Sequence, residues 1–274
     1  MDKKVPSLNL SGLKDIIWAF IIFISLIALL VGLIAGAFTR YSGEREIRTA
    51  MLKGEKTEVV VDTVDSSTRS DGSLHELTET ADAGDDYLYS LTWLTDSIAV
   101  GLRNNSLYTS KVWGSEAGNL SMANISDWKI RFSDGSTLSP AEAAMVAKPS
   151  VLVIAIGSDG LRMVTEETFI SGYTQLIESI LAVSPDTKII CCSIITPGVS
   201  YSGADGLTST DVAVANEWVK TVCINTGSYY AHASESVETG NTLLTSYAGS
   251  NNKALNTTGL AEWLAWFRTH ALTA

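Results

Sequence analysis

The stretch SVLVIAIG, residues 150–157, is a continuous apolar run of the kind found in strands that are buried on both faces of a sheet. A second such run, TKIICCSII, covers residues 187–195. Between them, TEETFISGYTQLIESILAVS (165–184) has helical periodicity, with Thr165 as its expected N-cap and acidic residues in its first turn. Two buried strands joined by a helix predict a β-α-β unit and therefore a parallel sheet.

The same alternation extends from residue 86 to the end of the chain. Further strands are predicted in YLYSLTWL (87–94), TSKVWG (109–114) and YYAHAS (229–234). Further helices are predicted after Ser97, in TSTDVAVANEWVKTVCINTG, which ends before Gly227, and in the amphipathic TTGLAEWLAWFRTHAL, with Trp263 and Phe267 facing inward. We therefore predict an α/β fold, a three-layer α/β/α sandwich with a five-stranded parallel sheet (strands near 88–94, 110–113, 150–157, 188–195 and 229–233).

In such sheets, binding sites lie beyond the carboxyl ends of the strands. Ser97, the Gly157-Ser158-Asp159 turn and the segment after Tyr230 all fall on that edge.

A separate apolar segment, IIWAFIIFISLIALLVGLIAGAF, covers residues 16–38 and has 23 residues without a charge. It is long enough to cross a hydrocarbon core of about 30 Å. A cleavable signal peptide is the alternative, because Ala35-Gly36-Ala37 resembles a cleavage site, but its apolar stretch is usually only about 7–15 residues. We predict an uncleaved transmembrane anchor. Three Lys/Arg before it and five after it favour a cytoplasmic domain, yet long domains translocate regardless of such counts.

The chain thus divides into a short N-terminal segment (1–15), the anchor (16–38), an acidic spacer (39–85) with one β-prone stretch, TEVVVDTV, and a globular domain (86–274). Its net charge of −11 and the lack of a basic stripe exclude a nucleic-acid partner. Residues 41–92 carry twelve acidic and five basic side chains, so much of the negative charge lies in the spacer. The three cysteines, Cys191, Cys192 and Cys223, have neither a disulfide framework nor metal-ligand spacing, and no metal or cofactor is predicted.

Four segments resemble, in order, the motif blocks of the SGNH/GDSL hydrolase family, in particular its membrane-tethered, extracytoplasmic bacterial members. DDYLYSLTWLTDSIAVGL (85–102) resembles the first block, in which Ser97 would be the nucleophile, although Thr95 replaces the glycine. EAGNLS (116–121) resembles the second, where Gly118, or alternatively Gly114, would supply a backbone N–H to the oxyanion hole.

The third and fifth blocks depart from the family at their chemical positions. In IAIGSDGL (154–161), Asp159 stands where the family has its oxyanion-hole asparagine. In GSNNKALNTTGLAEWLAWF (249–267), Asn251 stands at the catalytic aspartate and Ala254 at the catalytic histidine. The resemblance therefore implies the scaffold together with degenerate catalytic motifs.

A serine nucleophile needs a base that is itself oriented by a third group. The chain has three histidines: His75 in the spacer, His232 on the last strand and His270 near the end of the last helix. With the family's strand order 2-1-3-4-5, His232 lies about 14 Å from the first strand, and helical rise carries His270 about 20 Å away. Neither is expected to reach Ser97. An ionised Asp159 cannot donate a hydrogen bond to an oxyanion. Because Ser97 is expected to lack both a base and this donor, we expect it to cap the helix that follows it.

We therefore expect a membrane-anchored pseudoenzyme that binds or scaffolds at the cell envelope. The alternative is an active serine esterase or O-deacetylase of cell-wall or capsular carbohydrate esters. A third reading is a purely structural partner of another envelope protein. By resemblance, the protein would span the cell membrane once through residues 16–38, with its C-terminal domain outside and a cell-wall or other carbohydrate as the expected ligand.

Overall fold

The computed structural model describes residues 70–104, 111–114, 120–132 and 135–272. The predicted anchor (16–38), the β-prone stretch of the spacer (57–64) and Gly118 lie outside these ranges. Among the helices of the described ranges, none is long and apolar enough to span a membrane.

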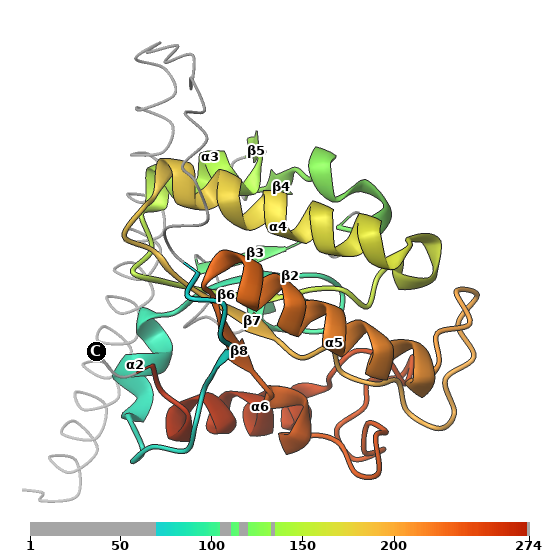
Figure 1. Ribbon diagram of the computed structural model, residues 1–274. Helices are drawn as coiled ribbons and strands as arrows, with labels where there is room; N and C mark the ends of the chain where they lie inside the picture. Colours follow the sequence, from blue (N-terminus) through green and yellow to red (C-terminus); the bar gives the residue numbers. More distant parts are fainter. Residues whose placement is uncertain (1–69, 105–110, 115–119, 133–134, 273–274) are drawn as a thin grey trace, which may run out of the picture. The chain divides into compact units, whose positions relative to one another are not determined.

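The described part is built on a six-stranded sheet whose strands all pair in parallel (Figure 1). Its order is β1-β8-β7-β6-β2-β3. The strands are β1 (His75–Glu76), β2 (Thr92–Thr95), β3 (Val112–Gly114), β6 (Val151–Ala155), β7 (Lys188–Cys192) and β8 (Tyr229–Ala231). The five predicted strands are present, and they follow the 2-1-3-4-5 order that the family resemblance implies. A small antiparallel pair, β4 (Ile130–Arg131) and β5 (Thr137–Leu138), lies apart from this sheet.

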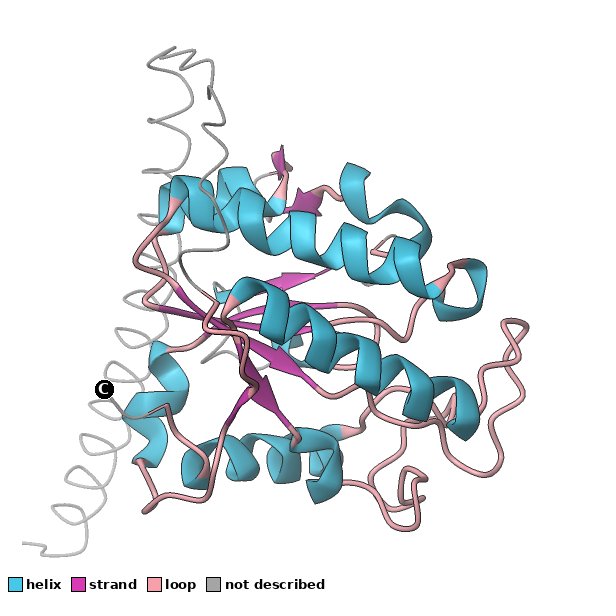
Figure 2. Ribbon diagram, viewed as in Figure 1, coloured by secondary structure: helices cyan, strands magenta, loops and turns pink. Residues whose placement is uncertain are grey.

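Helices cover both faces of the sheet (Figure 2). One face carries α3 (Pro140–Ala147), α4 (Glu166–Val183) and α5 (Ser209–Thr226), which pack side by side. The other carries α6 (Thr257–Thr269), with α2 (Gly84–Ser90) against it. The predicted α/β/α layering is therefore confirmed.

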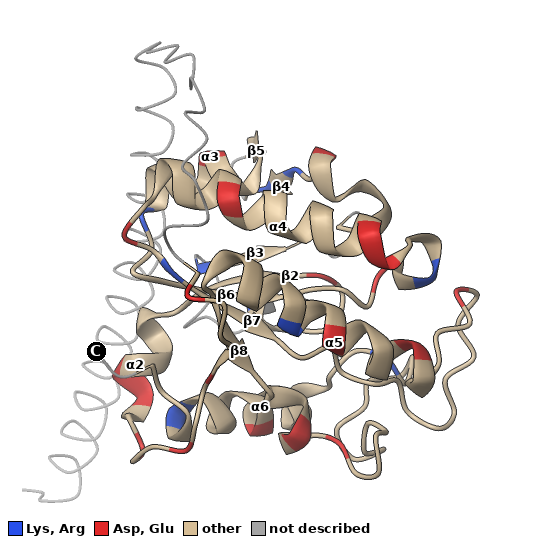
Figure 3. Cartoon of the chain, in the orientation of Figure 1, with Lys and Arg blue, Asp and Glu red and all other residues tan. Residues whose placement is uncertain are grey.

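The long helices begin and end where their sequences predict. Thr165 caps α4 by accepting a hydrogen bond from the backbone N–H of Thr168, and carboxylates lie in the first turns of α4 and α5 (Figure 3). These charges suit the positive end of a helix dipole. Gly227 ends α5 in the left-handed conformation, with φ of +64°.

The core between α6 and the sheet is aromatic. Trp93 of β2 lies with its ring centroid 5.1 Å from those of both Trp263 and Phe267 of α6. All three side chains are buried, which confirms the inward orientation predicted for the last helix. This packing fixes α6 against one face of the sheet.

One prediction about the start of the domain is wrong. Residues 87–90 belong to helix α2 and not to the first strand, which begins only at Thr92. Leu88 and Leu91 are both buried, and this i, i+3 spacing puts the two side chains on one face of a helical turn but on opposite faces of a strand. After Ser97, where a helix is predicted, the described residues form the short 3₁₀ helix η2 (Val100–Asn104).

The sheet has six strands where five were predicted, because the segment assigned to the spacer contributes β1. His75 and Glu76 pair with Tyr229 and Tyr230 at the edge of the sheet. Beyond β1, the backbone N–H groups of Thr80 and Ala83 donate to carbonyls at the end of α6. Leu77 is buried in the aromatic core cluster. Residues 75–83 are therefore packed as part of the domain.

If this packing contributes to stability, replacing Leu77 with alanine lowers the free energy of unfolding by about 2 kcal/mol or more, as is usual for a buried leucine. Urea denaturation of the purified protein measures the effect. The exposed Glu79→Ala is the matched control and is expected to change stability by less than about 0.5 kcal/mol. Equal stabilities of the two variants would show that this segment is a mere spacer.

Candidate functional site

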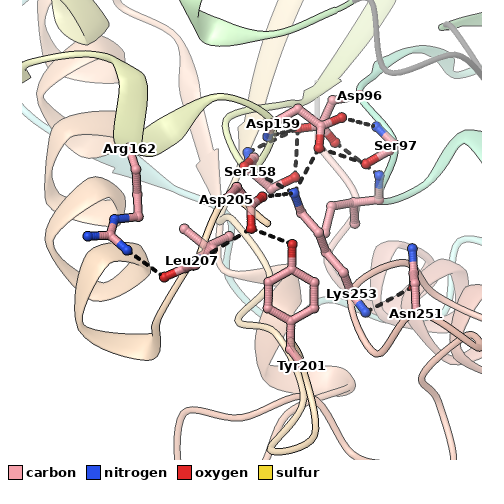
Figure 4. A network of polar contacts seen from close by, with 12 residues as sticks. Asp96, Ser97, Ser158, Asp159, Arg162, Tyr201, Asp205, Leu207, Asn251 and Lys253 are labelled. Atoms are coloured by element: carbon pink, nitrogen blue, oxygen red, sulfur yellow. Dashed lines mark hydrogen bonds and ion pairs between the residues drawn. The ribbon is translucent and has the colours of Figure 1, made fainter. Parts of the chain in front are cut away.

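Four loops meet at the carboxyl edge of the sheet (Figure 4). They follow β2, β6, β7 and β8 in the chain. Their polar side chains, together with backbone groups of Ser158 and Asp159, form one connected network, and its members are Asp96, Ser97, Ser158, Asp159, Tyr201, Asp205 and Lys253. This is the edge at which the sequence places its candidate residues.

The deepest member of the network is Asp96, which is only 1% exposed. Its Oδ2 accepts hydrogen bonds from the backbone N–H groups of Gly157 (3.0 Å) and Ser158 (3.0 Å) and from the Ser158 hydroxyl (2.9 Å). Its Oδ1 accepts from the backbone N–H of Ile98 at 3.1 Å. One carboxylate thus fastens the end of β2 to the turn that follows β6.

The turn after β6 requires glycine at its first position. Gly157 has φ of +124°, and a Cβ there would lie 2.7 Å from Cδ1 of Ile194. Only glycine meets both conditions without strain. The turn can therefore direct its backbone N–H groups at Asp96.

Ser97 donates both of its polar hydrogens to one side chain. Its backbone N–H lies 3.0 Å from Oδ2 of Asp159, and its hydroxyl lies 2.8 Å from Oδ1. The prediction that Ser97 caps the next helix is therefore wrong. In the same turn, Oδ1 of Asp96 accepts the backbone N–H of Ile98 at 3.1 Å.

Asp159 is also bound to Lys253, which lies one residue before Ala254. The Lys253 ammonium is 2.9 Å from Oδ1 of Asp159, 3.0 Å from Oδ2 of Asp205 and 3.3 Å from the carbonyl oxygen of Ser158. The Asp205 carboxylate accepts a further hydrogen bond from the Tyr201 hydroxyl. Lys253 is only 6% exposed, so this cation joins the loops after β6, β7 and β8 in a largely water-free setting.

The pKa shifts follow from this arrangement. Burial, together with the nearby charge of Asp159, raises the pKa of Asp96 to about 6. Burial lowers the pKa of Lys253, but the hydrogen bonds and charges of Asp159 and Asp205 outweigh it and raise that pKa above its ordinary value. Lys253 therefore stays protonated and cannot act as a base.

The remaining candidate residues have structural roles or none at this site. Oδ1 of Asn251 accepts the backbone N–H groups of Lys253 and Ala254, both at 3.0 Å, and so shapes the turn that carries the lysine. Ala254 brings no ionisable group to the position that the resemblance gives to histidine. Gly114 closes β3, where a Cβ would lie 2.8 Å from the carbonyl oxygen of Thr95.

The three histidines lie in other contacts. His75 is 3.2 Å from Asp71, and His232 is 3.8 Å from Glu235. His270 stacks on Trp266 with ring centroids 3.9 Å apart. Within the described ranges, the hydroxyl of Ser97 has no histidine as a hydrogen-bond partner. Those ranges also hold no group of His, Cys, Asp and Glu side chains arranged to bind a metal ion.

Sequence reasoning missed Lys253, Asp205 and Tyr201. Lys253 lies in the segment that resembles the fifth block, but the resemblance gives a catalytic role only to the neighbouring positions of Asn251 and Ala254. Its partners Asp159 and Asp205 are 94 and 48 residues away, and no local pattern connects positions at such separations. The one signal in the sequence is that Lys253 is the single charged residue of the turn GSNNKALN (249–256) at the functional edge.

Chemically, the site combines an acceptor and a fixed cation around one serine. Oδ1 of Asp159 accepts both the Ser97 hydroxyl and the Lys253 ammonium. A carbonyl oxygen that gained negative charge beside Ser97 would meet the Asp159 carboxylate instead of a neutral donor. That arrangement disfavours acyl transfer, whose transition state needs donors directed at the oxyanion.

No family model and no curated protein matches the sequence. Among solved structures, the chain is similar to a GDSL-like lipase from Bacteroides thetaiotaomicron, with 12% identity, 69% of this chain and 90% of the other covered, and a TM-score of 0.49. Two similar structures are described as a GDSL-like lipase from Parabacteroides merdae (12% identity, 71% and 98% covered, TM-score 0.47) and an acylhydrolase from Bacteroides fragilis (13%, 77% and 94%, 0.47).

The raised pKa of Asp96 predicts a specific pH dependence. A carboxyl group with pKa 3.8 in the unfolded chain and about 6 in the folded domain stabilises the fold below 3.8, and this contribution is lost as the pH rises through 6. The free energy of unfolding of the wild type relative to Asp96→Asn should therefore increase as the pH falls, by up to about 3 kcal/mol between neutral pH and pH values below 3.8. Denaturation at a series of pH values measures it. The exposed Asp86→Asn is the control, and a parallel pH profile for Asp96→Asn would contradict the assignment.

The buried ion pair predicts a large effect of removing its cation. Lys253→Met leaves Asp159 beside Asp96 without a counter-charge and should cost about 3–5 kcal/mol. Adding Asp159→Asn should restore part of this loss, because the uncompensated charge disappears. The exposed pair of Lys129 and Glu142, 3.5 Å apart, supplies the control Lys129→Met, expected to cost less than about 1 kcal/mol. Similar losses for the two lysine variants, measured by chemical denaturation, would refute this account.

Proposed function

We propose that this protein is a membrane-anchored SGNH/GDSL-hydrolase-like domain that no longer hydrolyses esters and acts by binding or scaffolding at the cell envelope. One observation carries the proposal: the Ser97 hydroxyl donates to a carboxylate that is already paired with the Lys253 ammonium. A serine nucleophile needs a base with a free lone pair and a third group that orients it. The described site offers Ser97 neither a histidine nor an unprotonated lysine.

The loss extends beyond the base. Asp159 stands where the resemblance places a neutral donor, and removal of one oxyanion donor alone costs roughly 10²–10³ in rate. Ala254 and Asn251 replace the two remaining triad positions. The four loops are nonetheless held in a defined arrangement by buried hydrogen bonds and ion pairs. A rigid loop edge without catalytic groups supports a binding role.

Envelope location is part of the proposal and rests on the family resemblance and on the 23-residue apolar segment at 16–38. Protease added to intact cells should digest the C-terminal domain. Complete protection in intact cells, with digestion after lysis, would place the domain on the inner side.

The alternative function, a serine esterase or O-deacetylase of carbohydrate esters, has one observation in its favour. The 2.8 Å hydrogen bond from the Ser97 hydroxyl to Asp159 would let this carboxylate take the serine proton as the oxygen attacks an ester carbonyl. Lys253 would then hold Asp159 in position. In this reading Asp159→Asn abolishes activity, whereas in the pseudoenzyme reading there is no activity to abolish.

A fluorophosphonate probe and p-nitrophenyl acetate distinguish the two functions. We expect the wild type to be labelled and to hydrolyse the ester no faster than Ser97→Ala, because nothing activates the hydroxyl. Labelling of the wild type that Ser97→Ala and Asp159→Asn both remove would establish the esterase. As a positive control for the scaffold, the combined Asn251→Asp, Ala254→His and Asp159→Asn changes should gain hydrolysis, and Ala254→His alone should gain little, since a triad acts as a unit.

A further inference from the structure

We propose that a single internal water molecule binds directly beneath the Ser97 loop, where it bridges the indole N–H of Trp263, the hydroxyl of Ser193 and the carboxylate of Asp96. The proposal concerns a site in the core of the domain. It holds whether or not the protein is an enzyme.

A small cavity supplies the space. It has a volume of about 10 Å³ and lies at the carboxyl ends of β2, β6 and β7, against α6. Its polar lining consists of Asp96, Ser158, Ser193 and Trp263, and isoleucines with Ala155 make up the rest. This is close to the smallest volume that holds one water molecule, and internal waters occupy cavities that offer them polar partners.

Trp263 supplies an unpaired donor. The residue is 1% exposed, and its Nε1 has no hydrogen-bond partner among the described residues. The indole cannot turn away, because Trp93 and Phe267 pack against its ring at centroid distances of 5.1 Å. A buried donor left without an acceptor costs about 1–3 kcal/mol, and a water molecule in the adjoining cavity removes that cost.

Ser193 and Asp96 complete the coordination. Oγ of Ser193 accepts the backbone N–H of Ser234 at 2.9 Å, which leaves its hydroxyl hydrogen to be donated. Oδ1 of Asp96 accepts the N–H of Ile98 and retains a second lone pair. The water therefore accepts from Trp263 and Ser193 and donates to Asp96, which makes three hydrogen bonds, the number typical of an internal water.

Such a water connects α6 and β7 to the carboxylate that orders the site. It provides Asp96 with a further donor and adds hydrogen bonds to the apolar contacts by which Ile98 and Ala99 join the aromatic core. The water thereby stabilises the turns after β2 and β6.

Nuclear magnetic resonance of the full chain in detergent, with ¹⁵N-labelled tryptophan, tests the proposal. The indole hydrogen of Trp263 should show a direct cross-relaxation peak to water. Trp93 is the matched control, since its Nε1 is also buried without a partner among the described residues but the residue does not line the cavity. Trp263→Phe and Trp93→Phe, which keep an aromatic ring at each position, assign the two resonances.

A peak at Trp263 with none at Trp93 supports the water site. Absence of the peak at Trp263, or peaks of equal intensity at both indoles, overturns it. Should either phenylalanine variant fail to fold, triple-resonance assignment of the wild type gives the same comparison. A high-resolution crystal structure provides a second measurement: electron density within hydrogen-bond distance of Trp263, Ser193 and Asp96 is expected, and an empty cavity would refute the proposal.

Discussion

The buried carboxylate of Asp96 is the constraint on which the candidate site depends. A charged group at 1% exposure is costly unless hydrogen bonds satisfy it, and here the donors come from two different loops. Gly157 and Ser158 turn their backbone N–H groups toward it, and Ile98 contributes from its own loop. The hydrogen bonds to Asp96 thus fix the relative positions of the loops after β2 and β6. They thereby bring Ser97 of one loop within hydrogen-bond distance of Asp159 of the other.

A second level of order comes from charge. Asp159 and Asp205 hold Lys253 between them, and the three groups lie on loops that follow β6, β7 and β8. The lysine stands next to the position that the family resemblance gives to a histidine. Lys253 keeps its proton, and Ala254 has no group that could take one up, so ion pairing holds this edge of the sheet together without a base. These two features are the physical basis for the proposed loss of hydrolysis.

Much of the fold was accessible from local pattern. The runs at 150–157 and 187–195 are too apolar to face water on either side of a sheet. The helix between them is recognisable from its N-cap, Thr165, and from its apolar stripe. Near residue 90 the pattern was ambiguous, because a short and mostly apolar run fits a buried strand or a short helix. The two-residue strand β1 could not be predicted, because His75 and Glu76 have little strand propensity. They form a strand only through their pairing with Tyr229 and Tyr230.

The candidate site divides in the same way. The sequence by itself determined the parallel α/β architecture, the edge at which Ser97 and Asp159 lie, and which chemical groups are missing at positions 251 and 254, because each depends on local periodicity or on residue identity. Only the tertiary structure decided what those residues do instead. Ser97 binds Asp159 and caps no helix, Asp96 collects the donors of a turn some sixty residues away, and Lys253 finds two carboxylates on other loops. These contacts join loops that are distant in the chain, and their geometry exists only once the sheet has brought the carboxyl ends of its strands together.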